Sequence, residues 1–157
     1  MDVQIIPAAI EHVTSLHHAL DAVAREGEYL TRRQAPPIDS VHCFVAQLLE
    51  QGHPQFVAVA GPEVVGWCDI RGTADPNKMG LGVLGIGLLA PYRGRGLGNR
   101  LLGGTLEAAR RCRFAGVALL VRKSNKRAIT LYQKFGFQFV EDRDGTNNDL
   151  FRMAMTF

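Results

Sequence analysis

The sequence predicts a mixed α/β domain built from seven strands and four helices. Segments with helical spacing of apolar residues alternate with short apolar runs that are typical of strands. The length of 157 residues suits a single domain, which we expect to span residues 1–157. At 46% hydrophobic and 21% charged residues, the chain has enough apolar side chains to build one core.

The N-terminal third predicts one strand followed by two helices. The strand is expected at Val3 to Ile6, and the first helix spans Ala9 to Arg25, where apolar residues recur at helical spacing. Gly27 to Pro37 is a predicted loop. The second helix is expected to begin with Asp39 or Ser40 as its cap, because either side chain can accept a hydrogen bond from a free backbone N–H group.

Strand patterns dominate the middle of the chain. Phe56 to Ala60 and Val64 to Ile70 flank the turn Gly61-Pro62-Glu63, which is typical of a hairpin. The remaining predicted elements are a strand at 81–89, a helix at 97–110, a strand at 117–121, a helix at 126–135, and strands at 137–141 and 150–155.

Composition and spacing exclude several classes of protein. The net charge of +3 comes without a recognisable nucleic-acid-binding module, so we expect no nucleic-acid partner. No apolar run approaches membrane-spanning length and no signal peptide is visible, so we expect no membrane partner and a cytoplasmic location. The three cysteines and five histidines have neither disulfide nor metal-ligand spacing, and no metal is expected.

The stretch PYRGRGLGNRLL, residues 91–102, places glycines and arginines directly before a helical pattern. Its glycines are Gly94, Gly96 and Gly98. A helix start has free backbone N–H groups and a partial positive charge, and glycines let the backbone approach a ligand closely. Arg93 and Arg95 add positive charge, so the stretch predicts a site for a phosphate or pyrophosphate.

A second glycine pattern does not indicate a nucleotide site. Residues 80–85 match G-x-G-x-x-G, but they fall inside a strand pattern and Pro91 follows, whereas a dinucleotide fingerprint must open a helix. The chain also has no P-loop motif.

Two motifs resemble those of the GNAT superfamily of N-acetyltransferases. Residues 93–98, RGRGLG, fit R/Q-x-x-G-x-G/A, the pyrophosphate-binding motif of that family. Residues 125–137 are similar to its second signature, N-x-x-A-x-x-L-Y-x-x-x-G-F. The element order fits across nearly the whole chain, and two motifs at the right separation are far more specific than either alone.

The resemblance implies a GNAT-like fold with a central mixed seven-stranded sheet, flanked by four helices and splayed between strands four and five. It also implies acetyl-CoA as cosubstrate, with its pyrophosphate on the amides of Arg95 to Asn99 and its pantetheine arm paired with the backbone of Ile86 to Leu88. Gly85 and Gly87 suit a bulged, splayed strand or close packing. The implied cofactor-binding residues are Ile86, Gly87, Leu88, Arg93, Gly94, Arg95, Gly96, Leu97, Gly98, Asn99 and Asn125.

Asn125 and Tyr132 lie seven residues apart, so they share a helix face about 10 Å apart along the axis. In the family the asparagine binds the cofactor and the tyrosine protonates the leaving thiolate. A phenol can serve as that acid. Two alternatives stay open, because Asn125 can cap the helix and Tyr132 can belong to the core.

The general base is less clear from the sequence. Many members of the family carry a glutamate on the fourth or fifth strand, but the corresponding positions here are Val83 and Leu120. Asp69 and Glu28 are candidates by location, and a water chain or an amine that arrives neutral would also suffice. We therefore predict Tyr132 and Asp69 as the catalytic residues.

The predicted reaction is transfer of an acetyl group to a primary amine, by direct attack in a ternary complex. The acceptor is a small molecule or a peptide N-terminus, and the loop Gly27 to Pro37 is expected to shape its pocket. A non-catalytic acyl-CoA-binding or sensor domain on the same fold is the alternative. A homodimer is left open.

Overall fold

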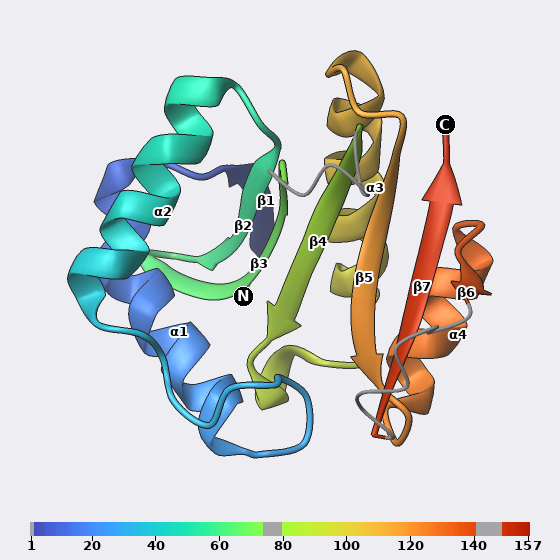
Figure 1. Ribbon diagram of the computed structural model, residues 1–157. Helices are drawn as coiled ribbons and strands as arrows, with labels where there is room; N and C mark the ends of the chain where they lie inside the picture. The colour runs from blue at the N-terminus through green and yellow to red at the C-terminus, as the bar shows by residue number, and fades with distance from the viewer. Residues whose placement is uncertain (1, 74–79, 141–148) are drawn as a thin grey trace.

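The computed structural model describes residues 2–73, 80–140 and 149–157. The predicted fold class is confirmed, since a seven-stranded mixed sheet is flanked by four helices (Figure 1). The strands are β1 (Val3–Pro7), β2 (Gln55–Ala60), β3 (Glu63–Arg71), β4 (Leu81–Leu88), β5 (Gly116–Arg122), β6 (Gln138–Val140) and β7 (Leu150–Thr156). The helices are α1 (Val13–Arg25), α2 (Ile38–Gln51), α3 (Leu97–Arg111) and α4 (Lys126–Lys134).

The sheet has the order β1-β2-β3-β4-β5-β7-β6. The first four strands form antiparallel neighbours, β4 and β5 run parallel, and β7 lies antiparallel between β5 and β6. The β4–β5 pairing extends only from Leu81↔Gly116 to Val83↔Ala118, although both strands continue beyond it. Figure 1 shows the two strands diverging from this point, so the predicted splay is confirmed.

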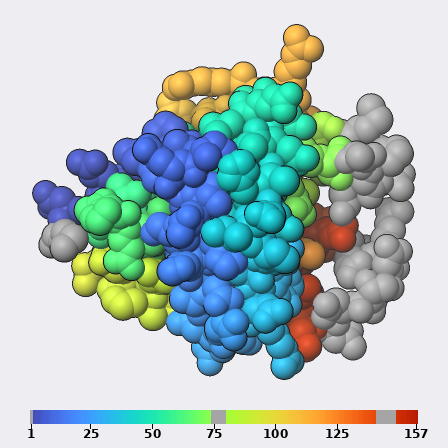
Figure 2. Space-filling model, turned by 90° about the vertical axis from the view of Figure 1, so that its left-hand side faces the viewer, coloured from blue at the N-terminus to red at the C-terminus, as the bar shows by residue number. Residues whose placement is uncertain are grey.

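Helices cover both faces of the sheet, but not evenly. Helices α1 and α2 pack on one face of β2 and β3, and Figure 2 shows them side by side across that side of the molecule. Helices α3 and α4 cover the opposite face. Side chains alternate between the faces along β3, so Trp67 packs toward α1 and α2, while Cys68 and Ile70 belong to the α3–α4 side.

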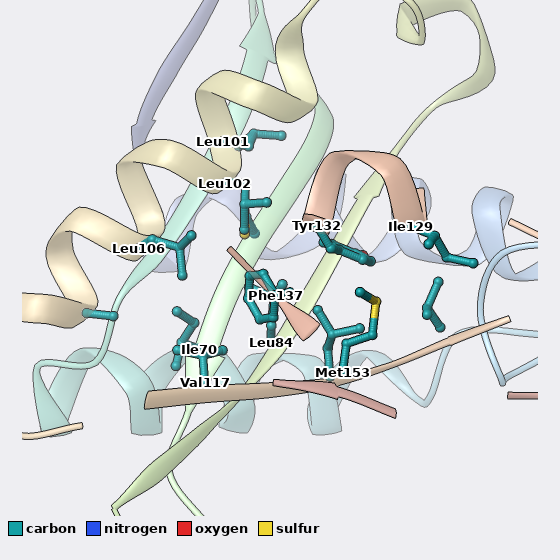
Figure 3. Close-up of a cluster of buried hydrophobic side chains, with 14 of the residues drawn as sticks. Ile70, Leu84, Leu101, Leu102, Leu106, Val117, Ile129, Tyr132, Phe137 and Met153 are labelled. Carbon is teal, nitrogen blue, oxygen red and sulfur yellow. The ribbon is translucent and has the colours of Figure 1, made fainter. Parts of the chain in front are cut away.

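The core between the sheet and α3–α4 contains Tyr132 among apolar side chains. Figure 3 shows Tyr132 beneath α4 in the same cluster as Phe137, Leu84, Leu102 and Met153. The rings of Tyr132 and Phe137 meet edge to face, with centroids 5.7 Å apart. This contact fixes the orientation of the phenol ring.

Two predicted helix starts are wrong in detail. Helix α2 begins at Ile38 with Pro37 as its cap residue and no side-chain capping bond, so neither Asp39 nor Ser40 is the cap. Asp39 instead lies in the first turn, where a carboxylate is favoured by the partial positive charge of the helix start.

The start of α1 is later than predicted, because residues 10–12 form a 3₁₀ turn before it. The Ala9 N–H group donates to His12 Nδ1 at 2.9 Å and closes that turn. The predicted strand at 137–141 is observed at 138–140, and residue 141 lies outside the described residues. In the described part of the chain, no helix combines the length and apolar character needed to cross a bilayer.

Candidate active site

The glycine turn before α3 has the backbone geometry that its sequence predicts. Gly94 and Gly96 have φ angles of 76° and 78°, in the left-handed region that a side chain would strain. Gly96 is the residue before the helix, and its carbonyl accepts the N–H of Arg100 at 3.3 Å. The N–H groups of residues 97–99 therefore precede the first helical hydrogen bond and remain available to a ligand.

A cavity of about 600 Å³ connects this turn with the opening between β4 and β5. It brings most of the predicted site residues together. Those that line it are Ile86, Gly87, Leu88, Arg93, Gly94, Gly96, Gly98, Asn99, Asn125 and Tyr132.

Arg95 and Leu97 are the two predicted cofactor-binding residues whose side chains the structure places elsewhere. Arg95 is exposed, and its guanidinium lies over the ring of Tyr92 at 5.3 Å. Leu97 is buried in the core. Any contact of the buried Leu97 with a ligand would therefore come from its backbone amide.

The glycines of β4 are explained by close packing rather than by a bulge. A Cβ atom on Gly87 would come within 2.4 Å of the Trp67 ring, and one on Gly85 would lie 3.3 Å from Asp69 Oδ1. Both glycines therefore make room for side chains of the neighbouring strand β3. Beyond Val83, the edge of β4 that faces β5 has no strand partner among the described residues, so an extended ligand could pair with it.

The Arg93 side chain makes three contacts with other parts of the chain. Its Nη2 atom lies 2.7 Å from Glu26 Oε2, and its Nε donates to the Leu88 carbonyl at 3.0 Å. The guanidinium also lies over the Tyr29 ring, 4.2 Å from the centroid. Its charge is thus largely compensated, and it connects the end of α1 with β4.

Two cations beside the start of α3 were not among the site residues predicted from the sequence. Arg127 and Lys134 both line the cavity. Lys134 Nζ donates to Asn99 Oδ1 at 3.2 Å, and Arg127 Nη1 would lie 3.9 Å from a Cβ on Gly94. Their spacing of seven residues puts them on one face of α4, and this was the signal that could have found them.

Asn125 caps α4 and also borders the cavity. It is the N-cap of α4, where its Oδ1 accepts the N–H of Ala128 at 3.2 Å, and it also lines the cavity. Its amide NH₂ group can still donate hydrogen bonds.

Tyr132 also belongs to both the core and the cavity. The residue is only 6% exposed, and its burial raises the pKa of the phenol above its ordinary value. The hydroxyl therefore stays protonated at neutral pH and remains available as a donor.

Asp69 is close to the cavity but does not line it. Its carboxylate lies against Gly85, between Trp67 and Arg71, which do line the cavity. Burial raises the pKa of Asp69 to about 7, although the positive charge of Arg71 acts in the opposite direction. Val83 and Leu120 line the cavity as apolar residues, while Glu28 is exposed and lies outside its lining.

The loop between α1 and α2 reaches the opposite side of the cavity. Residues 29–32 of this loop line it. Arg122, at the end of β5, donates to the Leu30 carbonyl from Nη2 at 2.7 Å and from Nε at 3.1 Å. Asp21 accepts the N–H of Ala35 at 2.9 Å on the α1 side. The loop is therefore held from both sides of the split sheet.

The model of the acetyltransferase (GNAT) family matches residues 18–137, well over half of the chain. The chain belongs to the GNAT acetyltransferase family. The matched region contains both the glycine turn before α3 and the helix that carries Asn125 and Tyr132.

Curated GNAT relatives include N-alpha-acetyltransferases. N-alpha-acetyltransferase 50 of Danio rerio is 32% identical over 108 residues, covering 68% of this chain and 64% of that protein. An N-alpha-acetyltransferase of Sulfolobus acidocaldarius is 34% identical over 121 residues, covering 71% and 72% of the two chains. The match to the zebrafish protein thus spans slightly less than two thirds of its length, and that to a probable N-acetyltransferase of Drosophila melanogaster spans 59%.

Solved GNAT structures share the whole fold. A GNAT acetyltransferase from Streptococcus pneumoniae superposes with a TM-score of 0.84 at 21% identity, covering 99% of this chain and all of that one. A putative acetyltransferase from Salmonella typhimurium, solved with its cofactor acetyl-CoA, gives a TM-score of 0.86 at 17% identity, covering 98% and 93%. At these identities the likeness establishes the GNAT fold.

Proposed function

We propose that this protein transfers the acetyl group of acetyl-CoA to a primary amine. The observation that carries the proposal is the cavity that runs from the glycine turn of α3, through the opening between β4 and β5, to Tyr132. It joins an anion site to a proton donor. Acetyl-CoA would supply an activated thioester carbonyl there, which a neutral amine can attack directly.

The phosphate end fits a pyrophosphate by its own chemistry. Free N–H groups of residues 97–99 meet the partial positive charge of the α3 start, and Gly96 leaves open space where a side chain would otherwise project. Arg127 and Lys134 add two cations on the facing helix. Arg93 would contribute mainly by holding the turn in place.

The β4 edge fits the amide-bearing arm of CoA. Ile86 to Leu88 line the cavity with backbone groups that face the open side of the split sheet. An arm with two amides could pair with this edge as an extra strand would. Asn125, at the start of α4, offers its amide NH₂ group from the other side.

The proton transfers are assigned to Tyr132 and Asp69. Tyr132 would donate its proton to the departing thiolate, since its phenol is protonated at neutral pH. Asp69, with a pKa of about 7, would accept the proton of the amine through an intervening water, because Gly85 separates it from the cavity by backbone alone. Cys43, Cys68 and Cys112 are not among the residues that line the cavity, which favours direct attack over an acyl-cysteine relay.

The acceptor would be an α-amine, of a peptide N-terminus or of a small molecule. The names of the relatives, which are N-alpha-acetyltransferases, support this class of amine. We also propose a cytoplasmic location, which the free cysteines support, while a homodimer stays a prediction.

The test incubates the purified protein with acetyl-CoA and a panel of amines and peptides, and detects acetylated products by mass spectrometry. We expect a mass increase of one acetyl group on α-amines. Tight binding of acetyl-CoA without any product from the panel would instead favour the non-catalytic acyl-CoA-binding domain.

A further inference from the structure

A second hollow, of about 370 Å³, opens beside the main cavity. The two share Arg71, Val83 and Leu120, and Val83 is the last residue of β4 that pairs with β5. The hollow therefore lies at the point where the sheet begins to split. Its lining consists of Arg71, Gly72, Thr73, Val83, Ala118, Leu119, Leu120 and Arg152.

Two guanidinium groups border the hollow from opposite sides. Arg71 ends β3 and pairs with Val83, whereas Arg152 lies on β7 and pairs with Leu120. The sheet order β3-β4-β5-β7 thus places them on either side of the split, with apolar Val83 and Leu120 between them. Leu120 keeps 54% of its surface exposed, because the α1–α2 layer does not extend over this part of the sheet.

Neither arginine forms an ion pair with a described residue. The ion pairs of the described chain join Arg25 to Asp21, Arg93 to Glu26 and Arg111 to Glu107, and none involves Arg71 or Arg152. The carboxylate of Asp69 faces Arg71 from the same strand, but it is turned against Gly85. Among the described residues that line the two cavities there is no aspartate or glutamate, whereas Arg32, Arg71, Arg122 and Arg152 are present.

We propose that Arg71 and Arg152 bind an anionic group of the acceptor, so that the acceptor is an α-amine bearing a nearby carboxylate or phosphate. The inference rests on the proposed function and narrows its substrate class. The planar fork of an arginine matches a carboxylate or a phosphate through two parallel hydrogen bonds. Val83 and Leu120 would contact the carbon skeleton that joins the anion to the amine. A polyamine or aminoglycoside would bring further positive charge to a site that already repels it.

The activity arm of the test compares acceptors that differ only in the anionic group. L-alanine is compared with L-alaninamide, and the peptide Ala-Asp-Gly-amide with Ala-Asn-Gly-amide, so that a small acid and an acidic peptide are distinguished. In the pair whose anionic member is the better substrate, we divide kcat/KM of the anionic acceptor by kcat/KM of the neutral one. We expect this ratio to fall at least tenfold in Arg71→Gln and in Arg152→Gln. Because both acceptors depend on the same base, the ratio cancels any effect of Arg71 on Asp69. The matched control is Arg113→Gln, at an exposed position beyond the end of α3.

A binding arm needs no catalysis. Succinate, which has carboxylates but no amine, is titrated into the protein and followed by calorimetry. We expect binding that weakens at least tenfold in both variants and persists in Arg113→Gln. Succinate binding that is the same in all four proteins would overturn the proposal, even if the protein acetylates neutral amines. If instead no amine is acetylated while succinate binding depends on both arginines, the proposed function fails and the anion site stands.

Discussion

Arg93 Nη2 and Glu26 Oε2 lie 2.7 Å apart and join two segments that are 67 residues apart in sequence. Glu26 ends α1, and Arg93 leads into the glycine turn of α3. The side chains are only 18% and 32% exposed, so the pair is better shielded from water than a surface ion pair. The glycine turn before α3 is thereby fixed to the loop that forms the opposite wall of the cavity.

This ion pair leads to a prediction about stability. Glu26→Gln should lower the free energy of unfolding by about 1 kcal/mol or less, since the pair is partly exposed. Arg93→Ala should lower it by about 2 kcal/mol, because the Leu88 hydrogen bond and the Tyr29 contact are lost as well. Urea denaturation measures both. Arg111→Ala, which removes a pair with more than two thirds of each side chain exposed, is the control and should change stability very little.

A substitution at Gly96 tests the anion site. Gly96→Asp should lower acetyl-CoA affinity at least a hundredfold, because it puts a carboxylate beside the free N–H groups of α3. Calorimetry measures the affinity. Gly52→Asp is a matched control, since Gly52 has a φ of 70° and equally open surroundings but lies at the end of α2. Both variants should lose about 1 kcal/mol of stability through backbone strain. An equal loss of affinity in both would contradict the site.

The salt dependence of binding tests Arg127. If its guanidinium meets a phosphate, Arg127→Gln should weaken acetyl-CoA binding by about tenfold at low salt. It should also flatten the dependence of the dissociation constant on salt, since fewer charges are then paired. Lys126→Gln is the neighbouring control, because Lys126 is exposed and is not among the lining residues. Identical salt slopes in the two variants would remove Arg127 from the site.

Tyr132→Phe separates the catalytic role of this residue from its packing role. The ring that meets Phe137 is kept and only the hydroxyl is lost, so thermal stability should stay close to that of the wild type. Turnover should fall by about 10²-fold, the lower part of the range for general acid catalysis, with little change in acetyl-CoA affinity. Tyr92→Phe, at a position that is not part of the lining, should keep its activity. Unchanged turnover in Tyr132→Phe, with chemistry rate-limiting, would end the acid assignment.

Asp69→Asn should have opposite effects on stability and rate. The folded protein raises the pKa of Asp69 from 3.8 to about 7, so ionisation of this carboxyl costs stability increasingly as the pH rises between those values. The variant should therefore be more stable than the wild type at pH 8, by roughly 2–4 kcal/mol, and this advantage should vanish near pH 3.8. Denaturation at a series of pH values measures it, with the exposed Asp2→Asn as control.

The same substitution should change the pH profile of the rate. In the wild type kcat/KM should rise through an apparent pKa near 7, as Asp69 becomes able to accept a proton. Asp69→Asn should lack this rise. Its loss of activity should be largest between pH 7 and the pKa of the amine, because above that pKa the amine is already neutral and needs no base. A variant with the wild-type profile would leave a water chain as the acceptor of the proton.

The sequence determined the elements and the local geometry of the site. Apolar residues at helical or strand spacing predicted the seven strands and four helices. An element that buries one face shows this in the spacing of apolar residues that are close in sequence. The turn at Gly94 and Gly96 was also predictable, since glycine readily adopts the positive φ angles that such a turn needs. Residues 125–137 placed Asn125 and Tyr132 on one helix face for the same local reason.

The electrostatic surroundings of the candidate site arise only in the folded chain. The sequence predicted Arg93 as a phosphate ligand from its neighbours, whereas its ion pair with the distant Glu26 arises only in the folded chain. The pKa of Asp69 is raised because its carboxyl is buried against β4. Arg71 and Arg152 lie on opposite sides of the split because of the order of four strands in the sheet. The hydrogen bonds of helices and turns, and the apolar periodicity of each element, involve residues that are close in sequence. The sequence therefore reveals them directly. Electrostatic interactions depend on distance in space and on exclusion of water, and both arise only when the chain has folded.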